Sequence, residues 1–205
     1  MHRAVATILR EFEKRSAIEL EEMRRMEKSG TQRHLDDFLL AVGPATGQLI
    51  NLLAKEASAQ IILEVGSSYG YSTVWLAEAA RETGGKVISL ESHSDKQQHA
   101  RASIQKAGLD GVVDFRLGDA RDSLRKMKER VDFVLLDVWK DLYIPCFDLF
   151  YTRLKPGALI AADNMIVPES SRRHADAYRR HVRTKPGIQS VLLPVGSGIE
   201  LSRYK

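Results

Sequence analysis

Short apolar runs alternate with amphipathic segments from about residue 60 onward. The apolar runs lie at 61–65, 86–90, 112–117, 132–137 and 158–163, and each ends near a polar or acidic residue. Segments with helical spacing of apolar residues lie between them, at about 72–82, 95–107, 121–129 and 142–153. Strands that are buried on both faces read as continuous apolar runs, and helices connect them when they are parallel. The pattern therefore predicts an α/β fold, with a mostly parallel sheet covered by helices on both faces.

The two ends of the chain depart from this alternation. Residues 3–28 contain no Gly or Pro and predict a long helix that ends at 29–31, and a second helix is predicted over 45–56 after Gly43-Pro44. A further helix is expected near 170–184, and the segments IQSVLLPV and GIELSRY flank a glycine-rich turn, which predicts an antiparallel hairpin that closes the sheet edge. We expect a single domain over 1–205, with 1–57 as an N-terminal helical extension.

Composition narrows the class of protein. Hydrophobic residues make up 43% of the chain and charged residues 28%, which excludes a disordered, collagen-like or coiled-coil protein. Cys146 is the only cysteine, and the start MHRAVATILREFEKRS lacks the apolar run of a signal peptide or membrane helix, so we expect a cytoplasmic protein without a membrane partner. The net charge is +4, and the basic excess gathers at 121–130 and 169–185 without interleaved aromatic residues. This favours solvated helix faces over a nucleic-acid surface.

Candidate cofactor residues fall at the carboxyl ends of the first three predicted strands, where ligands of such sheets bind. Gly66 and Gly70 follow the first strand and permit a tight turn with close backbone approach to a ligand. The spacing E-x-G-x-x-x-G differs from the pyrophosphate-binding G-x-G-x-x-G and favours a nucleoside without phosphates. Glu91 is placed to accept from ribose hydroxyls, and Asp119 from an adenine amino group. The glycine turn alone is as often structural, so the interpretation depends on the ordered set.

Candidate metal ligands follow the fourth and fifth strands. Asp137, Asp163 and the Asn164 carbonyl meet at one edge of such a sheet and offer three hard oxygen ligands, which suits Mg²⁺. An octahedral ion keeps further positions that two vicinal hydroxyls of a catechol would fill. Lys140 lies close enough to accept a phenolic proton as a general base. An Asp-Asn pair alone is more often a helix cap and a single lysine more often a surface residue, so only the joint pattern favours a site.

The segments AVGPATGQLINLL, ILEVGSSYGYSTVWLA, DFVLLDVWKDLY and LIAADNMIVPE resemble, in order, those of the catechol O-methyltransferase group of metal-dependent methyltransferases, which includes the caffeoyl-CoA O-methyltransferases. The resemblance spans about Phe38 to Pro168, and WKD is closer to the catechol branch. It implies a Rossmann-like seven-stranded sheet, S-adenosylmethionine as cofactor, magnesium at Asp137, Asp163 and Asn164, and Lys140 as general base. The expected cofactor-binding set is Val42, Glu64, Gly66, Ser72, Glu91, Asp119, Ala120, Asp137 and Trp139.

The same resemblance suggests an acceptor pocket. Phe38 stands where the animal catechol enzymes carry a gating tryptophan, Pro168 fits the opposite wall, and Glu200 matches a carboxylate that meets the second catechol hydroxyl. Val138 replaces a histidine, which is expected to weaken one cofactor contact. The expected substrate-contacting set is Phe38, Leu40, Lys140, Asn164, Pro168 and Glu200.

We therefore expect Mg²⁺-dependent methyl transfer from S-adenosylmethionine to one hydroxyl of a catechol-like small molecule, by a protein that the resemblance implies to be a homodimer. Two alternatives stay open. One is a tRNA hydroxyuridine O-methyltransferase, in which the arginines of 172–183 contact phosphates. The other is a non-catalytic protein that binds S-adenosylmethionine.

Overall fold

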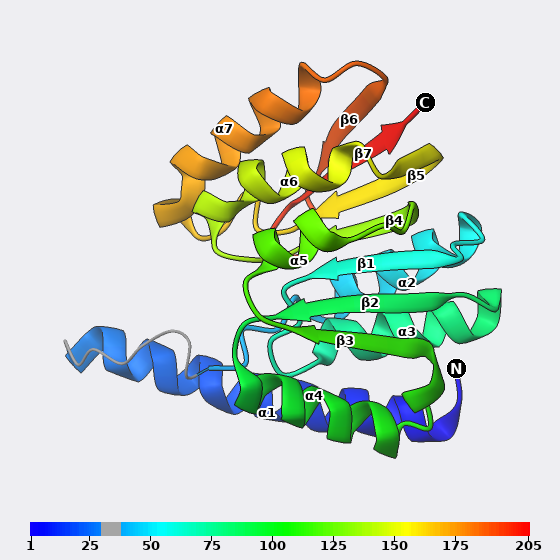
Figure 1. Cartoon of the computed structure of the whole chain (residues 1–205). Helices are drawn as coiled ribbons and strands as arrows, with labels where there is room; N and C mark the ends of the chain where they lie inside the picture. The colour runs from blue at the N-terminus through cyan, green and yellow to red at the C-terminus, as the bar shows by residue number, and fades with distance from the viewer. Residues whose placement is uncertain (30–37) are drawn as a thin grey trace.

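The computed structural model describes residues 1–29 and 38–205, and its centre is a mixed sheet of seven strands (Figure 1). The strands are β1 (Ile61–Val65), β2 (Lys86–Glu91), β3 (Val113–Leu117), β4 (Val131–Leu136), β5 (Leu154–Ala162), β6 (Ile188–Leu193) and β7 (Ile199–Tyr204). Their order is β3-β2-β1-β4-β5-β7-β6. The first five strands are parallel, and β7 runs antiparallel to both β5 and β6. The predicted α/β fold with a C-terminal antiparallel hairpin is confirmed.

Helices cover both faces of the sheet. They are α1 (Arg3–Ser29), α2 (Pro44–Glu56), α3 (Tyr71–Thr83), α4 (Ser94–Lys106), α5 (Ala120–Lys126), α6 (Tyr143–Tyr151) and α7 (Arg172–Arg183), with 3₁₀ turns η2 (Asp110–Val112), η3 (Lys140–Leu142) and η4 (Glu169–Ser171). Successive side chains of a strand point to opposite faces. On β4, Phe133 and Leu135 join the core with α1 to α4, whereas Val134 and Leu136 join the core with α5 to α7.

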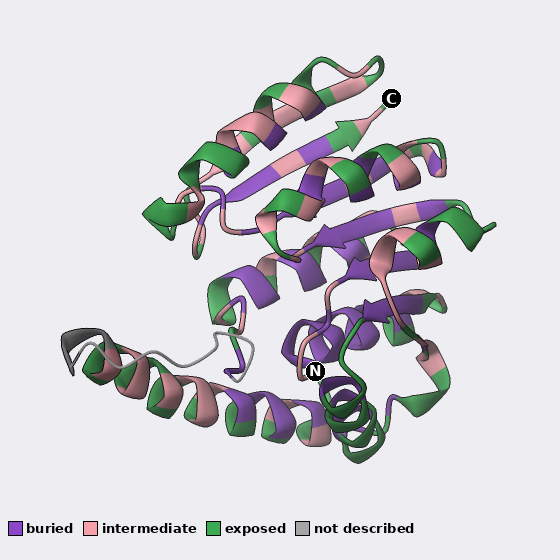
Figure 2. Cartoon of the chain, turned by 60° about the vertical axis from the view of Figure 1, so that its left-hand side comes forward, coloured by how far each residue is buried: buried purple, intermediate pink, exposed green. Residues whose placement is uncertain are grey.

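The N-terminal helices are partly built into this core. Val5, Ile8, Leu9 and Phe12 of α1 are buried in the same cluster as α2, α3 and α4. The part of α1 after Phe12 projects beyond the body of the domain, and its side chains over 13–26 are intermediate or exposed (Figures 1 and 2). The predicted helix end at 29–31 falls mostly outside the described residues. Within residues 1–29 and 38–205, no helix is long and apolar enough to cross a membrane.

The strand order places the site. The chain passes from β1 to β2 and β3 on one side and then returns to β4 on the other side of β1. The carboxyl ends of the five parallel strands lie at one edge of the sheet (Figure 1), and ligands of open α/β sheets bind at the point where the order reverses. The predicted cofactor and metal residues follow these strands.

Candidate active site

The turn between β1 and α3 contains two glycines that the local geometry requires. Gly66 has a φ of +95°, and a Cβ there would lie 2.1 Å from the backbone oxygen of Asp137. Gly70 has a φ of +101°, and a Cβ there would lie 2.8 Å from the Cβ of Ala100. L side chains rarely adopt such backbone conformations. The turn therefore packs closely between β4 and α4.

Glu64 lies near the end of β1 and connects that strand to the start of α3. Its carboxylate is fully buried and accepts hydrogen bonds of 2.7 Å from the hydroxyls of Ser72, Thr73 and Ser89. Burial raises the pKa of Glu64 to about 7, although the three hydroxyls favour the ionised form. Glu64 and Ser72, both expected to bind the cofactor, are thus bonded to each other beneath the turn.

Glu91 lies at the end of β2, directly beside the turn. One carboxylate oxygen accepts the backbone N–H of Ser68 at 2.8 Å, and the other accepts the backbone N–H groups of Ser92 and His93, each at 2.9 Å. These bonds fix the orientation of the carboxylate at the end of β2, and its contact with ribose stays a prediction.

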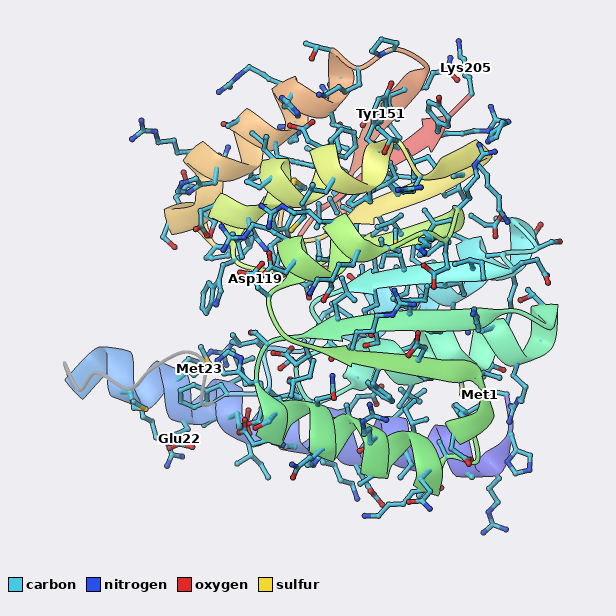
Figure 3. All side chains as sticks on the ribbon, viewed as in Figure 1. Met1, Glu22, Met23, Asp119, Tyr151 and Lys205 are labelled. Atoms are coloured by element: carbon cyan, nitrogen blue, oxygen red, sulfur yellow. The ribbon has the colours of Figure 1, made fainter. Side chains whose placement is uncertain are left out.

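Asp119, labelled in Figure 3, caps the start of α5 at the end of β3. Its carboxylate accepts from the backbone N–H of Arg121 at 2.7 Å and from the Arg121 guanidinium at 2.6 Å and 3.0 Å. Hydrogen bonds from Arg121 lower the pKa of Asp119 to about 2, so the group stays ionised at neutral pH. Ala120 is the first residue of α5.

The three predicted metal ligands come together at the ends of β4 and β5. Leu136 and Ala162, the last residues of β4 and β5, are paired in register, so Asp137 and Asp163, which directly follow the two strands, stand side by side. Asn164 comes next and has a left-handed backbone (φ +55°). Both carboxylate oxygens of Asp163 are buried and have no hydrogen-bond partner among the described residues. Burial, together with the Asp137 carboxylate, raises the pKa of Asp163 to about 8.

These residues fit a hard divalent cation. The buried carboxylate of Asp163, the partly buried carboxylate of Asp137 and the amide oxygen of Asn164 are the kind of donors that Mg²⁺ prefers. In the part of the chain that the structure describes, no group of three His, Cys, Asp or Glu side chains is arranged to hold a metal. The predicted site has only two such side chains, because its third ligand is the amide of Asn164.

Lys140, the first residue of η3, reaches into this group. Its Nζ donates to Asn164 Oδ1 at 2.8 Å, to the Val138 backbone oxygen at 3.1 Å and to the Tyr143 hydroxyl at 2.5 Å, and lies 3.8 Å from Asp137 Oδ1. Burial lowers the pKa of Lys140, while the two aspartates act in the opposite direction. A lysine whose pKa is lowered gives up its proton more readily and suits the predicted role of general base.

Tyr143 is a site residue that the sequence analysis missed. Its hydroxyl donates to the backbone oxygen of Asp163 at 3.1 Å and therefore accepts from Lys140. The ring is fully buried at the start of α6. The available signal was a tyrosine three residues after Lys140, but its apolar helical surroundings are typical of core packing.

The apolar side chains predicted to contact the acceptor or the cofactor differ in exposure. Phe38 and Val42 are buried, whereas Leu40 and Trp139 are 45% and 48% exposed. Pro168 follows Val167, which is also exposed, in the loop after β5. Exposed large apolar side chains at the carboxyl edge of the sheet offer surface to a flat ligand.

Glu200 is placed differently from the expectation. Its carboxylate on β7 is fully buried and is bound by Arg179 and Arg183 of α7 at 3.2 Å and 2.7 Å, and by the Ser190 hydroxyl at 2.6 Å. A carboxylate with its oxygens held in this way serves the packing of α7 on the sheet. We therefore correct the sequence-based expectation and leave Glu200 out of the acceptor site.

Comparisons with known proteins agree with this geometry. The O-methyltransferase family model matches residues 13–205. The catechol O-methyltransferase of Niastella koreensis is 36% identical over 131 residues, a match that covers 62% of this chain and 59% of that protein. The caffeoyl-CoA O-methyltransferase 2 of Populus trichocarpa is 33% identical over 178 residues, covering 77% of this chain and 72% of that protein.

Solved structures are similar as well. The O-methyltransferase from Bacillus cereus in complex with SAH is 26% identical, with a TM-score of 0.77 and coverage of 97% of this chain and 91% of that one. SAH-bound PaMTH1 from Podospora anserina shares the fold, with a TM-score of 0.76 at 19% identity, covering 100% of this chain and 89% of that one.

The fold and the strand-end site define a class I methyltransferase. The chain belongs to the O-methyltransferase family, with relatives named as catechol and caffeoyl-CoA O-methyltransferases, and is a SAM-dependent O-methyltransferase.

Proposed function

We propose that the protein transfers a methyl group from S-adenosylmethionine to one hydroxyl of a catechol-like small molecule, in a reaction that requires Mg²⁺. The observation that carries the proposal is the pair of buried Asp163 oxygens, which have no hydrogen-bond partner within residues 1–29 and 38–205, beside Asp137 and Asn164. Buried carboxylates normally have hydrogen-bond or metal partners. These three residues would hold the cation, which when bound favours the ionised form of a coordinated hydroxyl.

The remaining chemistry is assigned to side chains of this chain. Lys140 takes the proton of the reacting hydroxyl at Nζ, and Tyr143 and the Val138 backbone oxygen hold the amine in place. Attack of an anionic oxygen on a positively charged sulfonium methyl cancels charge, so exclusion of water favours the reaction. Leu40, Trp139 and Val167 supply apolar surface near the ends of the strands for this purpose.

Nucleic acid is the less favoured acceptor because most basic side chains of α7 already have partners. Arg172 pairs with Glu169, Arg179 with Asp176 and Glu200, and Arg183 with Glu200. These bonds leave fewer cations to contact phosphates.

The test is methyl transfer from radiolabelled S-adenosylmethionine to three acceptors: a catechol, a caffeoyl thioester and a tRNA that carries hydroxyuridine. We expect the catechol to be methylated with the highest kcat/KM. Preferred methylation of the tRNA with a steep salt dependence would contradict the proposal. Lys140→Ala should lower kcat by about 10²-fold or more while SAH still binds, because a positioned general base contributes about that much. Wild-type turnover in this variant would remove Lys140 from the mechanism.

We also propose, from the family resemblance, that the protein is a homodimer. The projecting half of α1 supports this, because Ile18 and Leu20 are 70% and 48% exposed there, and a second copy would remove their apolar surface from water. Sedimentation equilibrium is expected to give twice the 23.0 kDa chain mass.

A further inference from the structure

Two side chains of α1 reach segments that border the active site. Glu19 Oε2 accepts the backbone N–H of Leu39 at 2.6 Å, and Arg15 donates to the other oxygen of the same carboxylate, also at 2.6 Å. The Arg15 guanidinium lies 4.0 Å from the centre of the Tyr69 ring, in the glycine turn. One ion pair on α1 therefore contacts both the turn and the segment that precedes α2.

Leu39 is held from the opposite side as well. The Ser68 hydroxyl donates to the Leu39 backbone oxygen at 3.1 Å, and the Ser68 backbone N–H donates to Glu91 at 2.8 Å. Both backbone polar groups of Leu39 are thus satisfied by side chains. A continuous set of hydrogen bonds connects Glu19 through Leu39 and Ser68 to the carboxylate expected to bind ribose.

The segment from Phe38 to Val42 depends on these bonds because it has no regular structure of its own. Leu39 is buried, and the next residue, Leu40, has a left-handed backbone with a φ of +46°. A buried backbone N–H outside a helix or sheet needs an acceptor, and Glu19 is the one provided. A cavity of about 180 Å³, lined in part by Leu20 and Ala41, borders the segment between α1 and the start of α2, so apolar packing there is incomplete.

We propose that Glu19 is a positioning residue that sets the segment 38–42 as a wall of the cofactor and acceptor site, with Arg15 orienting its carboxylate. This inference rests on the proposed function, because Phe38, Leu40 and Val42 matter to the reaction only if they face its ligands. It makes the N-terminal helix a part of the binding machinery rather than an appended element. Glu19 itself touches no ligand and acts through Leu39.

The test compares three variants of the full chain. Glu19→Ala removes the acceptor, and Glu19→Asp keeps the charge on a shorter side chain. Glu21→Ala is the control, because Glu21 lies on an exposed face of the same helix and pairs there with Arg25. Hydrogen exchange of the Leu39 amide should be about tenfold faster in both Glu19 variants and unchanged in the control, as expected for loss of one charge-assisted hydrogen bond.

Ligand binding separates positioning from simple helix packing. In both Glu19 variants we expect the Kd for SAH and the KM for a catechol to rise about five- to tenfold, with kcat changed less than about twofold, as for a loss of uniform binding. Unchanged Leu39 exchange in Glu19→Asp and Glu19→Ala contradicts the hydrogen-bond assignment. Faster exchange with unchanged SAH and catechol binding contradicts the positioning role. Wild-type protein that binds SAH but methylates no catechol overturns the proposed function instead, and the exchange and SAH measurements still decide the role of Glu19.

Discussion

At the scale of single residues, the site depends on polar groups that hold one another in a buried setting. Lys140 has lowered basicity because of burial, and Tyr143 ties its amine to the backbone of Asp163. A tyrosine hydroxyl has one proton, and here the Asp163 backbone oxygen receives it. Tyr143 is therefore an acceptor toward Lys140, and its removal changes the position of the amine without changing the charge of the site.

Removal of this hydrogen bond should slow the reaction. Tyr143→Phe should lower kcat about tenfold, because a hydrogen bond to a charged group contributes about 1.5 kcal/mol or more, and should change the KM for S-adenosylmethionine little. Steady-state kinetics measures both. Tyr151→Phe is the matched control, since the Tyr151 hydroxyl donates to the Pro186 backbone oxygen on the surface. Equal kcat values in the two variants would show that Tyr143 contributes core packing and does not position the Lys140 amine.

The second prediction uses the raised pKa of Glu64. Because the pKa is about 7 in the folded protein and near 4.5 in the unfolded chain, the folded state binds the extra proton between these values. Stability must then fall as pH rises from about 4.5 to 7 and level off above. Glu64→Gln should remove this part of the pH dependence, up to about 3 kcal/mol for a shift of this size. Urea unfolding across pH measures it.

Glu78 supplies a control of opposite sign for that experiment. Against the effect of burial, hydrogen bonds from Lys55 and Asn51 lower the pKa of Glu78. Its contribution to stability is present above the unfolded pKa and is lost as pH falls through the lower, folded value. Glu78→Gln should therefore lower the free energy of unfolding at neutral pH. If this free energy changed with pH by the same slope in Glu64→Gln and Glu78→Gln, the raised pKa assigned to Glu64 would be wrong.

At the scale of elements, α1 has two parts with different roles. Phe12 is buried and meets the rings of Tyr71 and His99 edge-on at 5.9 Å and 5.8 Å, whereas Ile18, less than two turns further, is exposed. Phe12→Ala should lower the free energy of unfolding by about 3 kcal/mol, the usual cost of removing a buried aromatic ring. Lys14→Ala, which changes an exposed side chain on the same helix, should change the free energy of unfolding by less than about 0.5 kcal/mol. If chemical denaturation gave the same change in unfolding free energy for both variants, the buried packing of Phe12 against the core would be contradicted.

Most elements were predictable because continuous apolar runs and helical spacing are local signals. β1 agrees with the prediction in both bounds. β5 begins at Leu154, whereas the predicted strand began at 158, because Lys155, Pro156 and Gly157 interrupt the apolar run on which the prediction depended. The helix expected over 121–129 ends at Lys126, since Met127 takes an extended backbone (φ −65°, ψ 130°). Such ends depend on tertiary packing rather than on propensity.

At the scale of the whole molecule, the sequence placed the candidate site because parallel strands end at one edge of the sheet. Asp137 and Asp163 directly follow a pair of residues in register on β4 and β5, and Asn164 is the next residue, while their role as metal ligands stays a prediction. Contacts between distant elements were not predictable. The bond from the Leu39 N–H to Glu19 depends on how α1 docks. Glu200 faces α7 because it alternates on β7 with Ile199 and Leu201, which join the core on the opposite face of the sheet. No local sequence pattern predicts either of these contacts.

We propose that Asp137, Asp163 and Asn164 hold a divalent cation that methyl transfer requires. The most direct measurement is transfer from radiolabelled S-adenosylmethionine to a catechol by chelator-treated protein, with and without added Mg²⁺, for wild type and Asp163→Asn. Wild-type activity should disappear on chelation and return with Mg²⁺, and Asp163→Asn should not recover at the same concentration. Full turnover by chelated wild-type protein would contradict the account.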